Sequence, residues 1–323
     1  MFPRTLFARF AVNRTPALQG RQAPLPVALR FGMDARLKVC IRRLFMFDAV
    51  VFAGGGDRCY WQGGFYEAAA ARLGLSPKLV VGASAGAFAA AYSLLEAGPA
   101  TRARVIGACD PKLKNFDFAA WRAGKPLCPV GPMFCELLDQ TINANAFRRL
   151  QDMTDFRIAV SRLPRGLSPP IGAAIGIGVY QLEKQLFHPV HPRFGRALGF
   201  RSEFVAASSL NDPQQFRDAL MASSGVPPFM PVTNVAGRPA FDGGLVDNVP
   251  VEPLAPIEAA GGRSLVLLTR VYKTVPHVKG RTYVQPSRRI GVGQFDIRNP
   301  DGIRDAYELG LKDGDAFASS LNR

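Results

Sequence analysis

Histidine is scarce in this sequence and cysteine follows no recognisable pattern, so two common kinds of site are excluded at the outset. The 323 residues contain only three histidines, His188, His191 and His277. His188 and His191 stand beside prolines, where they cannot present two nitrogens on one face of a helix. The five cysteines are odd in number and form neither a C-x-x-C pair nor a four-ligand zinc spacing. The sequence therefore predicts neither a disulfide scaffold nor a metal site, and we expect no cofactor.

Signatures of nucleotide and nucleic-acid binding are missing as well. A P-loop would require Gly-Lys-Ser/Thr after the run Gly54-Gly55-Gly56, and the dinucleotide fingerprint would require a third glycine where Cys59 stands. The chain also lacks the aromatic and basic pattern of an RNA-binding module and the acidic loop of an EF-hand. We therefore expect no nucleic-acid partner and no calcium site.

Acidic residues are nearly absent from the N-terminal arm, residues 1–45. The formal net charge is +15, and residues 1–43 hold nine Arg and Lys residues against one acid. The arm has no continuous apolar segment long enough for a secretory signal. It can be interpreted as a basic amphipathic helix for an organelle or an anionic membrane, as an unfolded extension, or as the result of a start site placed too early, with Met33 or Met46 as the true start. We expect residues 1–45 to be poorly ordered and residues 46–323 to form the functional domain.

From residue 47 onward, short apolar runs, glycine turns and helical segments alternate along the chain. We expect strands over residues 48–53, 78–81, 156–160, 238–241 and 264–269, and helices over residues 61–73, 87–96 and 216–223. No internal repeat and no Ser/Pro-rich linker interrupts this order. The alternation predicts an α/β fold, with a mainly parallel central sheet covered by helices on both faces.

Residues 79–95 contain no charged side chain and approach the length of a membrane span. Gly82, Ser84 and Gly86 cluster near the start of this segment, where they favour a turn and disfavour insertion as a lone span. We therefore interpret the segment as a strand, a turn and a helix, with a membrane span as the alternative.

Residues 167–182 form a second apolar segment that is rich in glycine and too short to span a bilayer. A short apolar run of this kind is typical of a buried core segment. The alternative is a mobile flap over an apolar pocket or a loop that inserts into a surface, because Gly172, Gly176 and Gly178 weaken any regular element.

Three glycine-containing loops follow predicted strands and carry chemically useful residues. In Gly82-Ala83-Ser84-Ala85-Gly86, small neighbours allow a tight turn from strand to helix that would expose the Ser84 hydroxyl as a nucleophile. In Gly54-Gly55-Gly56, successive amide groups at a helix N-terminus can form a nest for an oxyanion or a phosphate.

The third loop contains Asp242, which ends a predicted strand and precedes Gly243 and Gly244. A carboxylate in such a turn can orient or accept a proton. Each of the three loops taken alone is compatible with a plain turn. Together they supply a nucleophile, a base and oxyanion donors, which are the parts that acyl transfer requires.

The order Gly-Gly-Gly-x-Arg, Gly-x-Ser-x-Gly, Asp-Gly-Gly resembles that of the patatin-like phospholipase family, and the likeness extends from about Phe47 to the C-terminus. Further similar features are Gln62, Gly64, the stretch 222–231, Asn248 and Pro250. The resemblance implies a three-layer α/β/α fold and a lipid acyl hydrolase of phospholipase A or lysophospholipase type. It also implies a catalytic dyad of Ser84 and Asp242, an oxyanion hole from Gly54, Gly55, Gly56 and Arg58, an elbow at Gly82 and Gly86, and an aspartate loop with Gly243 and Gly244.

One position departs from the family pattern, because Cys59 stands where members usually have a glycine. A side chain there is expected to narrow the site or shift the loop. Arg58 would brace the same loop in the family. From the residues alone, Arg58 is interpreted as a structural partner of a nearby carboxylate, and we expect it to act in this way in the family fold too.

Two other functions remain open from the residues. An α/β-hydrolase with a Ser84, Asp242, His277 triad has a compatible chain order. A non-enzymatic basic protein that binds membranes through its arm is the second alternative. For the leading hypothesis we expect a phospholipid or lysophospholipid substrate, contact with an anionic membrane surface, and a cytoplasmic location with peripheral membrane association, or export or organelle targeting by the arm.

Overall fold

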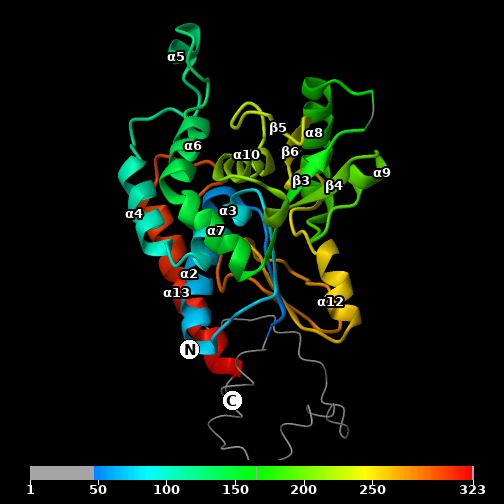
Figure 1. Ribbon diagram of the computed structural model, residues 1–323. Coiled ribbons are helices and arrows are strands. Elements are labelled where there is room, and N and C mark those ends of the chain that lie inside the picture. The colour runs from blue at the N-terminus through cyan, green and yellow to red at the C-terminus, as the bar shows by residue number, and fades with distance from the viewer. Residues whose placement is uncertain (1–46, 165, 322–323) are drawn as a thin grey trace, which may run out of the picture.

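The computed structural model describes residues 47–164 and 166–321, so the predicted basic arm, residues 1–45, lies outside the described residues. The fold is built on an eight-stranded sheet with the order β5-β6-β3-β2-β1-β7-β8, in which β4 also pairs with β3 (Figure 1). Strands β3, β2, β1, β7 and β8 are parallel, whereas β4, β5 and β6 are joined by antiparallel pairings. The strands are β1 Ala49–Phe52, β2 Leu79–Ala83, β3 Asp155–Arg162, β4 Arg201–Ala206, β5 Thr233–Val235, β6 Arg238–Asp242, β7 Ser264–Leu267 and β8 Arg281–Val284.

Helices connect these strands and cover both faces of the sheet, with α2, α4 and α13 on one side and α9 and α12 on the other (Figure 1). The α-helices are α2 Tyr60–Leu73, α3 Ala85–Leu94, α4 Gly98–Ala108, α5 Phe118–Arg122, α6 Val130–Thr141, α7 Ala144–Met153, α8 Pro169–Phe187, α9 Phe194–Ala197, α10 Pro213–Ser223, α11 Gly244–Asp247, α12 Ala255–Ala259 and α13 Pro300–Leu321. Short 3-10 turns are η2 Gly56–Cys59, η3 Ala207–Ser209 and η4 Glu252–Leu254. The prediction of an α/β/α fold with a mainly parallel sheet is confirmed.

The two faces of the sheet bury different cores because side chains alternate along each strand. Val50 and Phe52 of β1 join the larger core with α2, α3 and α13, whereas Ala49 and Val51 join a smaller core with α12. Helices α2 and α13 lie unusually close, since a Cβ on Gly310 would stand 2.1 Å from the carbonyl oxygen of Trp61. The larger core therefore holds the first strand–helix unit rigidly, and that unit begins with the triple-glycine loop.

Two sequence interpretations are settled by the fold. Residues 79–95 form β2, a turn and α3, so the alternative of a membrane span is wrong, and no helix in the described ranges is long and apolar enough to cross a membrane. Residues 169–182 of the segment 167–182 belong to α8, a regular helix that begins at Pro169. The interpretation as a loop is therefore wrong. The interpretation as a core segment holds for one side of α8, which packs on Leu163, Phe200 and Leu245, whereas the other side is exposed.

Candidate active site

Ser84 occupies the turn between β2 and α3 in a conformation that side chains seldom adopt. Its φ is +54°, in the left-handed region, which lifts the side chain out of the path of the chain. The neighbouring glycines, Gly82 and Gly86, leave no room for a side chain. A Cβ on Gly82 would stand 2.3 Å from the Cα of Ala87, and a Cβ on Gly86 would stand 2.3 Å from the carbonyl oxygen of Ala53. The predicted elbow is therefore formed by backbones in direct contact.

The structure brings Asp242 to Ser84, although 158 positions separate them in the sequence. The Ser84 hydroxyl donates a hydrogen bond of 2.6 Å to Oδ2 of Asp242, and the amide of Gly244 donates one of 2.6 Å to Oδ1. Asp242 ends β6, which pairs with β3, and a Cβ on Gly243 would stand 2.4 Å from the carbonyl oxygen of Ala159 in β3. The sheet and the glycine together fix the position of the carboxylate.

The Asp242 carboxylate is buried and only 7% exposed. Burial raises its pKa to about 6, because a low-dielectric environment disfavours the charged form. The hydrogen bonds from Ser84 and Gly244 act in the opposite direction and limit the rise. At neutral pH the group is an ionised carboxylate with a higher proton affinity than an ordinary aspartate.

Ser223 is a supporting residue to which the sequence analysis gave no role. Its hydroxyl accepts a hydrogen bond of 2.8 Å from the amide of Ser84 and donates one of 2.6 Å to the carbonyl oxygen of Ala159. It thus ties the turn that carries Ser84 to both α10 and β3. The only signal for it was its position in the stretch 222–231 that resembles the family.

The triple-glycine loop is anchored at its first residue. The carbonyl of Gly54 accepts hydrogen bonds of 2.7 Å from both Asn248 Nδ2 and Thr269 Oγ1, and its amide donates to the carbonyl of Asn248 at 2.9 Å. Among the described residues, no acceptor is found for the amides of Gly55 and Gly56, which line the space beside Ser84. Gly54 therefore supports the loop, and the free donors are the next two amides.

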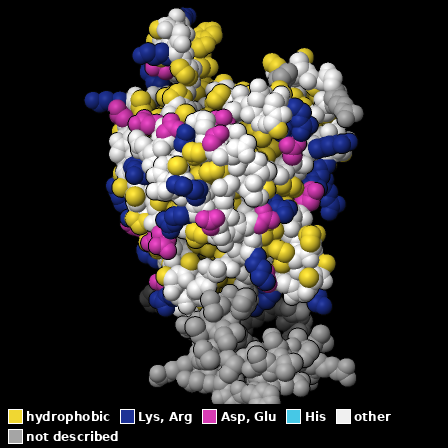
Figure 2. Space-filling view, in the orientation of Figure 1, with side chains coloured by type: hydrophobic (Ala, Val, Ile, Leu, Met, Phe, Trp, Pro, Cys, Tyr) yellow, Lys and Arg dark blue, Asp and Glu magenta, His cyan; other side chains and the backbone are white. Residues whose placement is uncertain are grey.

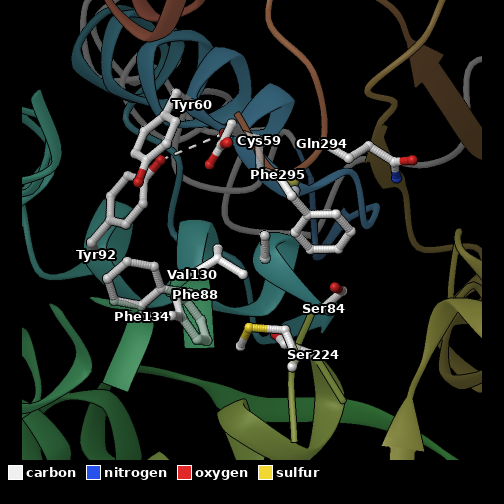
Figure 3. Close-up of a pocket in the computed structure, with 14 residues that line it drawn as sticks. Cys59, Tyr60, Ser84, Phe88, Tyr92, Val130, Phe134, Ser224, Gln294 and Phe295 are labelled. Atoms are coloured by element: carbon white, nitrogen blue, oxygen red, sulfur yellow. Dashed lines mark hydrogen bonds between the residues drawn. The ribbon is translucent and has the colours of Figure 1, made fainter. Parts of the chain in front are cut away.

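Arg58 and Cys59 follow this loop in the turn η2. The part of the chain that the structure describes contains no ion pair of Arg58, so its interpretation as the partner of a carboxylate is not supported. Cys59 is buried, its thiol lies 3.5 Å from the carbonyl of Ala53, and its own carbonyl accepts a hydrogen bond from Tyr92 (Figure 3). Burial raises the pKa of this thiol well above its usual value, which keeps it unreactive.

An apolar pocket with a cavity volume of about 60 Å³ opens on one side of Ser84. Figure 3 shows Tyr92, Phe88 and Phe134 gathered on one side of this pocket and Ser84 on the other. Its remaining wall includes Val130 and Phe295. Such a lining suits a hydrocarbon chain, because it offers buried apolar surface and few polar partners.

A second pocket, with a cavity volume of about 70 Å³, adjoins the first and shares Ser84 and Phe295 with it. Its wall contains more polar groups, including Asp242, Asn248 and Tyr180 of α8. Ser84 therefore lies where an apolar pocket meets a more polar one.

The histidines lie apart from Ser84 and Asp242. His277 is exposed in the connection between β7 and β8, and within the described ranges no histidine is hydrogen-bonded to Ser84 or Asp242. His191 is placed between Asp247, at 3.1 Å, and the hydroxyl of Tyr283, at 2.8 Å. No group of three or more metal-ligating side chains is found in the described part of the chain.

The model of a family described as patatin-like phospholipase matches residues 50–255, which is more than half of the chain. The matched region includes all three loops. None of the curated proteins matches the chain.

Proposed function

We propose that this chain, which belongs to the patatin-like phospholipase family, is a lipid acyl hydrolase that cleaves carboxylic esters of phospholipids or lysophospholipids. In this proposal Ser84 is the nucleophile and Asp242 is the base. The single observation that carries this proposal is the hydrogen bond of 2.6 Å from the Ser84 hydroxyl to Asp242 beside two unengaged backbone amides. A nucleophile, a base and oxyanion donors then surround one reacting carbonyl.

The reaction would proceed in two steps. Ser84 Oγ attacks the ester carbonyl while its proton passes to Asp242, and the amides of Gly55 and Gly56 stabilise the oxyanion. The tetrahedral intermediate collapses, the bond to the alcohol breaks, and Asp242 gives its proton to the departing oxygen. Water then attacks the acyl-enzyme, again through Asp242, and the fatty acid leaves as Ser84 regains its proton.

The buried position of Asp242 is useful in this scheme. A pKa of about 6 makes the carboxylate a stronger base than an exposed aspartate and leaves it ionised at neutral pH. The apolar pocket that contains Phe88 and Phe134 would hold the acyl chain of the substrate.

We further propose that the end of the molecule bearing α5 and α8 contacts an anionic phospholipid bilayer. The two helices project at the same end of the fold (Figure 1), and Figure 2 shows apolar side chains at both projections. Basic side chains accompany them, which suits anionic headgroups. The exposed apolar residues of the two helices are Phe118, Trp121, Ile171, Ile175, Leu182, Leu186 and Phe187, and the exposed basic residues around α5 are Lys112, Lys114, Arg122 and Lys125.

Tryptophan fluorescence tests this contact directly. The chain has two tryptophans, of which Trp61 is fully buried and Trp121 is 58% exposed. Anionic vesicles should shift the emission to the blue, and the shift should disappear in Trp121→Phe. Emission that does not change with anionic vesicles would rule out insertion of α5.

The catalytic proposal is tested by fatty-acid release from anionic phospholipid vesicles. We expect Ser84→Ala and Asp242→Asn to lose activity by a factor on the order of 10³ or more, and His277→Ala to retain it. Loss of activity in a folded His277→Ala variant would replace the dyad by a triad. A wild-type protein that releases no fatty acid, and whose Ser84 is not labelled by a fluorophosphonate, would overturn the proposal.

A further inference from the structure

Three cationic side chains from distant segments interact electrostatically with one another, close to a wall of the second pocket beside Ser84 that contains Tyr180. Arg58 belongs to η2, Lys184 to α8, and Arg270 to the segment that follows β7. We refer to these three residues as the cation cluster. The family resemblance assigns Arg58 to the oxyanion loop, but it gives no role to Lys184 or Arg270, so the grouping of the three cations requires its own explanation.

Tyr180 connects the cation cluster to the pocket. Its side chain lines the same pocket as Ser84 and Asp242. Its hydroxyl accepts a hydrogen bond of 3.2 Å from Arg270, and Lys184 Nζ lies 5.9 Å from the centre of its ring. Arg270 is also held close to the triple-glycine loop, because the preceding residue, Thr269, is bonded to that loop.

The carboxylate of Asp57 interacts electrostatically with Arg58, but it forms no ion pair with the cation cluster. No ion pair of Arg58, Lys184 or Arg270 occurs among the described residues, and the buried Nε of Arg270 has no hydrogen-bond partner there. Elsewhere in the fold, buried arginines are paired, since Arg281 binds Glu258 at 2.6 Å and Arg162 binds Glu203 at 2.6 Å.

The three cations also repel one another. Burial is the largest cause of a lowered pKa at both Arg58 and Lys184, and nearby cations add to it. Arg270 lowers the pKa of Arg58, and both arginines contribute to the fall of the Lys184 pKa to about 8. A bound anion would relieve this repulsion and satisfy the free donors.

We infer that the cation cluster and Tyr180 bind a phosphate group, as a phosphate monoester or diester, on the polar side of Ser84. An arginine presents two parallel donors that match phosphate oxygens, lysine adds a point charge, and the tyrosine hydroxyl has a proton of its own to donate. With the acyl chain in the apolar pocket and the phosphate at the cation cluster, an ester carbonyl lies between them at Ser84. This inference rests on the proposed function for its orientation, and it assigns the headgroup side of the site.

The first experiment compares two soluble substrates with the same acyl chains, dihexanoyl phosphatidylglycerol and dihexanoylglycerol, below the concentrations at which they aggregate. The measured quantity is the ratio of kcat/KM for the phosphate-bearing ester to that for the neutral ester. Lys184→Gln and Arg270→Gln should each lower this ratio about 10- to 100-fold, the effect of one charge-assisted hydrogen bond. Lys312→Gln, which removes an exposed lysine from α13, is the matched control and should leave the ratio unchanged.

The second experiment needs no catalysis and identifies the source of the phosphate. Inorganic phosphate and glycerol 3-phosphate are titrated into Ser84→Ala by calorimetry, with and without the additional change Arg270→Gln. A selective fall of the ratio without binding of inorganic phosphate supports a lipid headgroup as the ligand. Binding of inorganic phosphate that Arg270→Gln abolishes supports the cluster as a site for free phosphate as well.

The outcomes separate this inference from the proposed function. An unchanged ratio in both variants, together with no binding of either phosphate, overturns the inference while leaving the hydrolase intact. If neither ester is hydrolysed but Ser84→Ala binds phosphate through Arg270, the proposed function fails and the phosphate site stands.

Discussion

The loops that carry Ser84 and Asp242 and the helix α8 border the same pocket, but they are restrained in different ways. In the loops, the glycines lie in direct contact with the backbone of neighbouring segments. A Cβ on Gly86 would stand 2.3 Å from the carbonyl oxygen of Ala53, and one on Gly243 would stand 2.4 Å from that of Ala159. In α8, a Cβ on Gly178 would meet nothing within 4 Å. A Cβ on Gly172 of α8 would stand 2.4 Å from Cδ1 of Leu163, which is a side-chain atom. The position of the reacting groups is thus set by backbone contacts, whereas α8 meets side chains on its buried side and open space at Gly178.

The attachment of α8 explains how this helix is held without such backbone contacts. Side-chain interactions attach α8 to the fold. The buried carboxylate of Glu183 accepts hydrogen bonds from the amides of Arg193 and Phe194 at 2.7 and 2.9 Å. This joins the end of α8 to α9. Changes on α8 should therefore alter which lipid is bound and leave the geometry of Ser84 and Asp242 in place.

Apart from changes to Ser84 and Asp242 themselves, the largest expected effect comes from adding one methyl group to the loop that carries Ser84. Gly86→Ala would force α3 away from β1, and a shift of about 1 Å at the reacting groups costs on the order of 10² in rate. Overpacking should also destabilise the fold by about 1–3 kcal/mol. Fatty-acid release and the unfolding midpoint in urea measure the two effects. If Gly86→Ala retained full activity, backbone contact would not be what positions Ser84.

The next expected effect is a dependence of kcat/KM on pH, which arises from Asp242 in its loop and not from α8. The proposed base must be ionised, so kcat/KM should fall about tenfold for each pH unit below about 6 and reach a plateau above it. The profile is measured with a soluble ester. Asp57, whose pKa burial raises to about 7, is the other titrating carboxyl of this region, so the profile is repeated in Asp57→Asn.

The raised pKa of Asp242 also predicts that the stability of the fold depends on pH. The folded state favours the protonated form of Asp242, so this group stabilises the fold at low pH and that contribution is lost as pH rises through about 6. The Tm of Asp242→Asn should therefore exceed that of the wild type near about pH 8, and the difference should shrink toward about pH 4. A constant difference would mean that Asp242 does not titrate in this range.

A smaller effect is expected at the anchor of the triple-glycine loop. Thr269→Val removes the hydrogen bond of 2.7 Å to the carbonyl of Gly54 and keeps the size of the side chain. One hydrogen bond contributes about 1 kcal/mol, so we expect kcat to fall about fivefold as the free amides lose their fixed direction. The drop should appear in kcat rather than KM, because these amides act on the transition state. A change confined to KM would place Thr269 in substrate binding.

The same contrast explains how much could be predicted from the sequence. The strand–turn–helix units and the residues Ser84 and Asp242 were predictable, because tight turns require glycine at fixed positions and leave a local pattern. Ser223, Thr269 and Arg270 were not, because each acts through a contact made only in the folded chain and its residue type is common. Their contribution depends on the sheet that brings segments separated by more than a hundred positions together.

Helix α8 was misinterpreted for a related reason. Its glycines lower the intrinsic tendency of the segment to form a helix. The sequence does not reveal the residues of the folded protein against which the helix packs. Packing against Leu163 and Phe200 and the bonds of Glu183 override that tendency. Local pattern was therefore informative where the backbone is constrained and misleading where tertiary packing decides.

The smallest expected effect lies in α8 and sharpens the contrast with Gly86. Gly178 is exposed, has no positive φ, and leaves open space for a methyl group. Alanine loses less conformational freedom on folding than glycine, so Gly178→Ala should stabilise the protein by about 0.5–1 kcal/mol and leave fatty-acid release within about twofold of the wild type. Urea unfolding and the vesicle assay provide both values. If glycine-to-alanine substitution destabilises the protein at Gly86 and stabilises it at Gly178, the loop that carries Ser84 and the helix α8 are under different constraints. A loss of activity in Gly178→Ala would instead mean that α8 takes part in positioning the reacting groups.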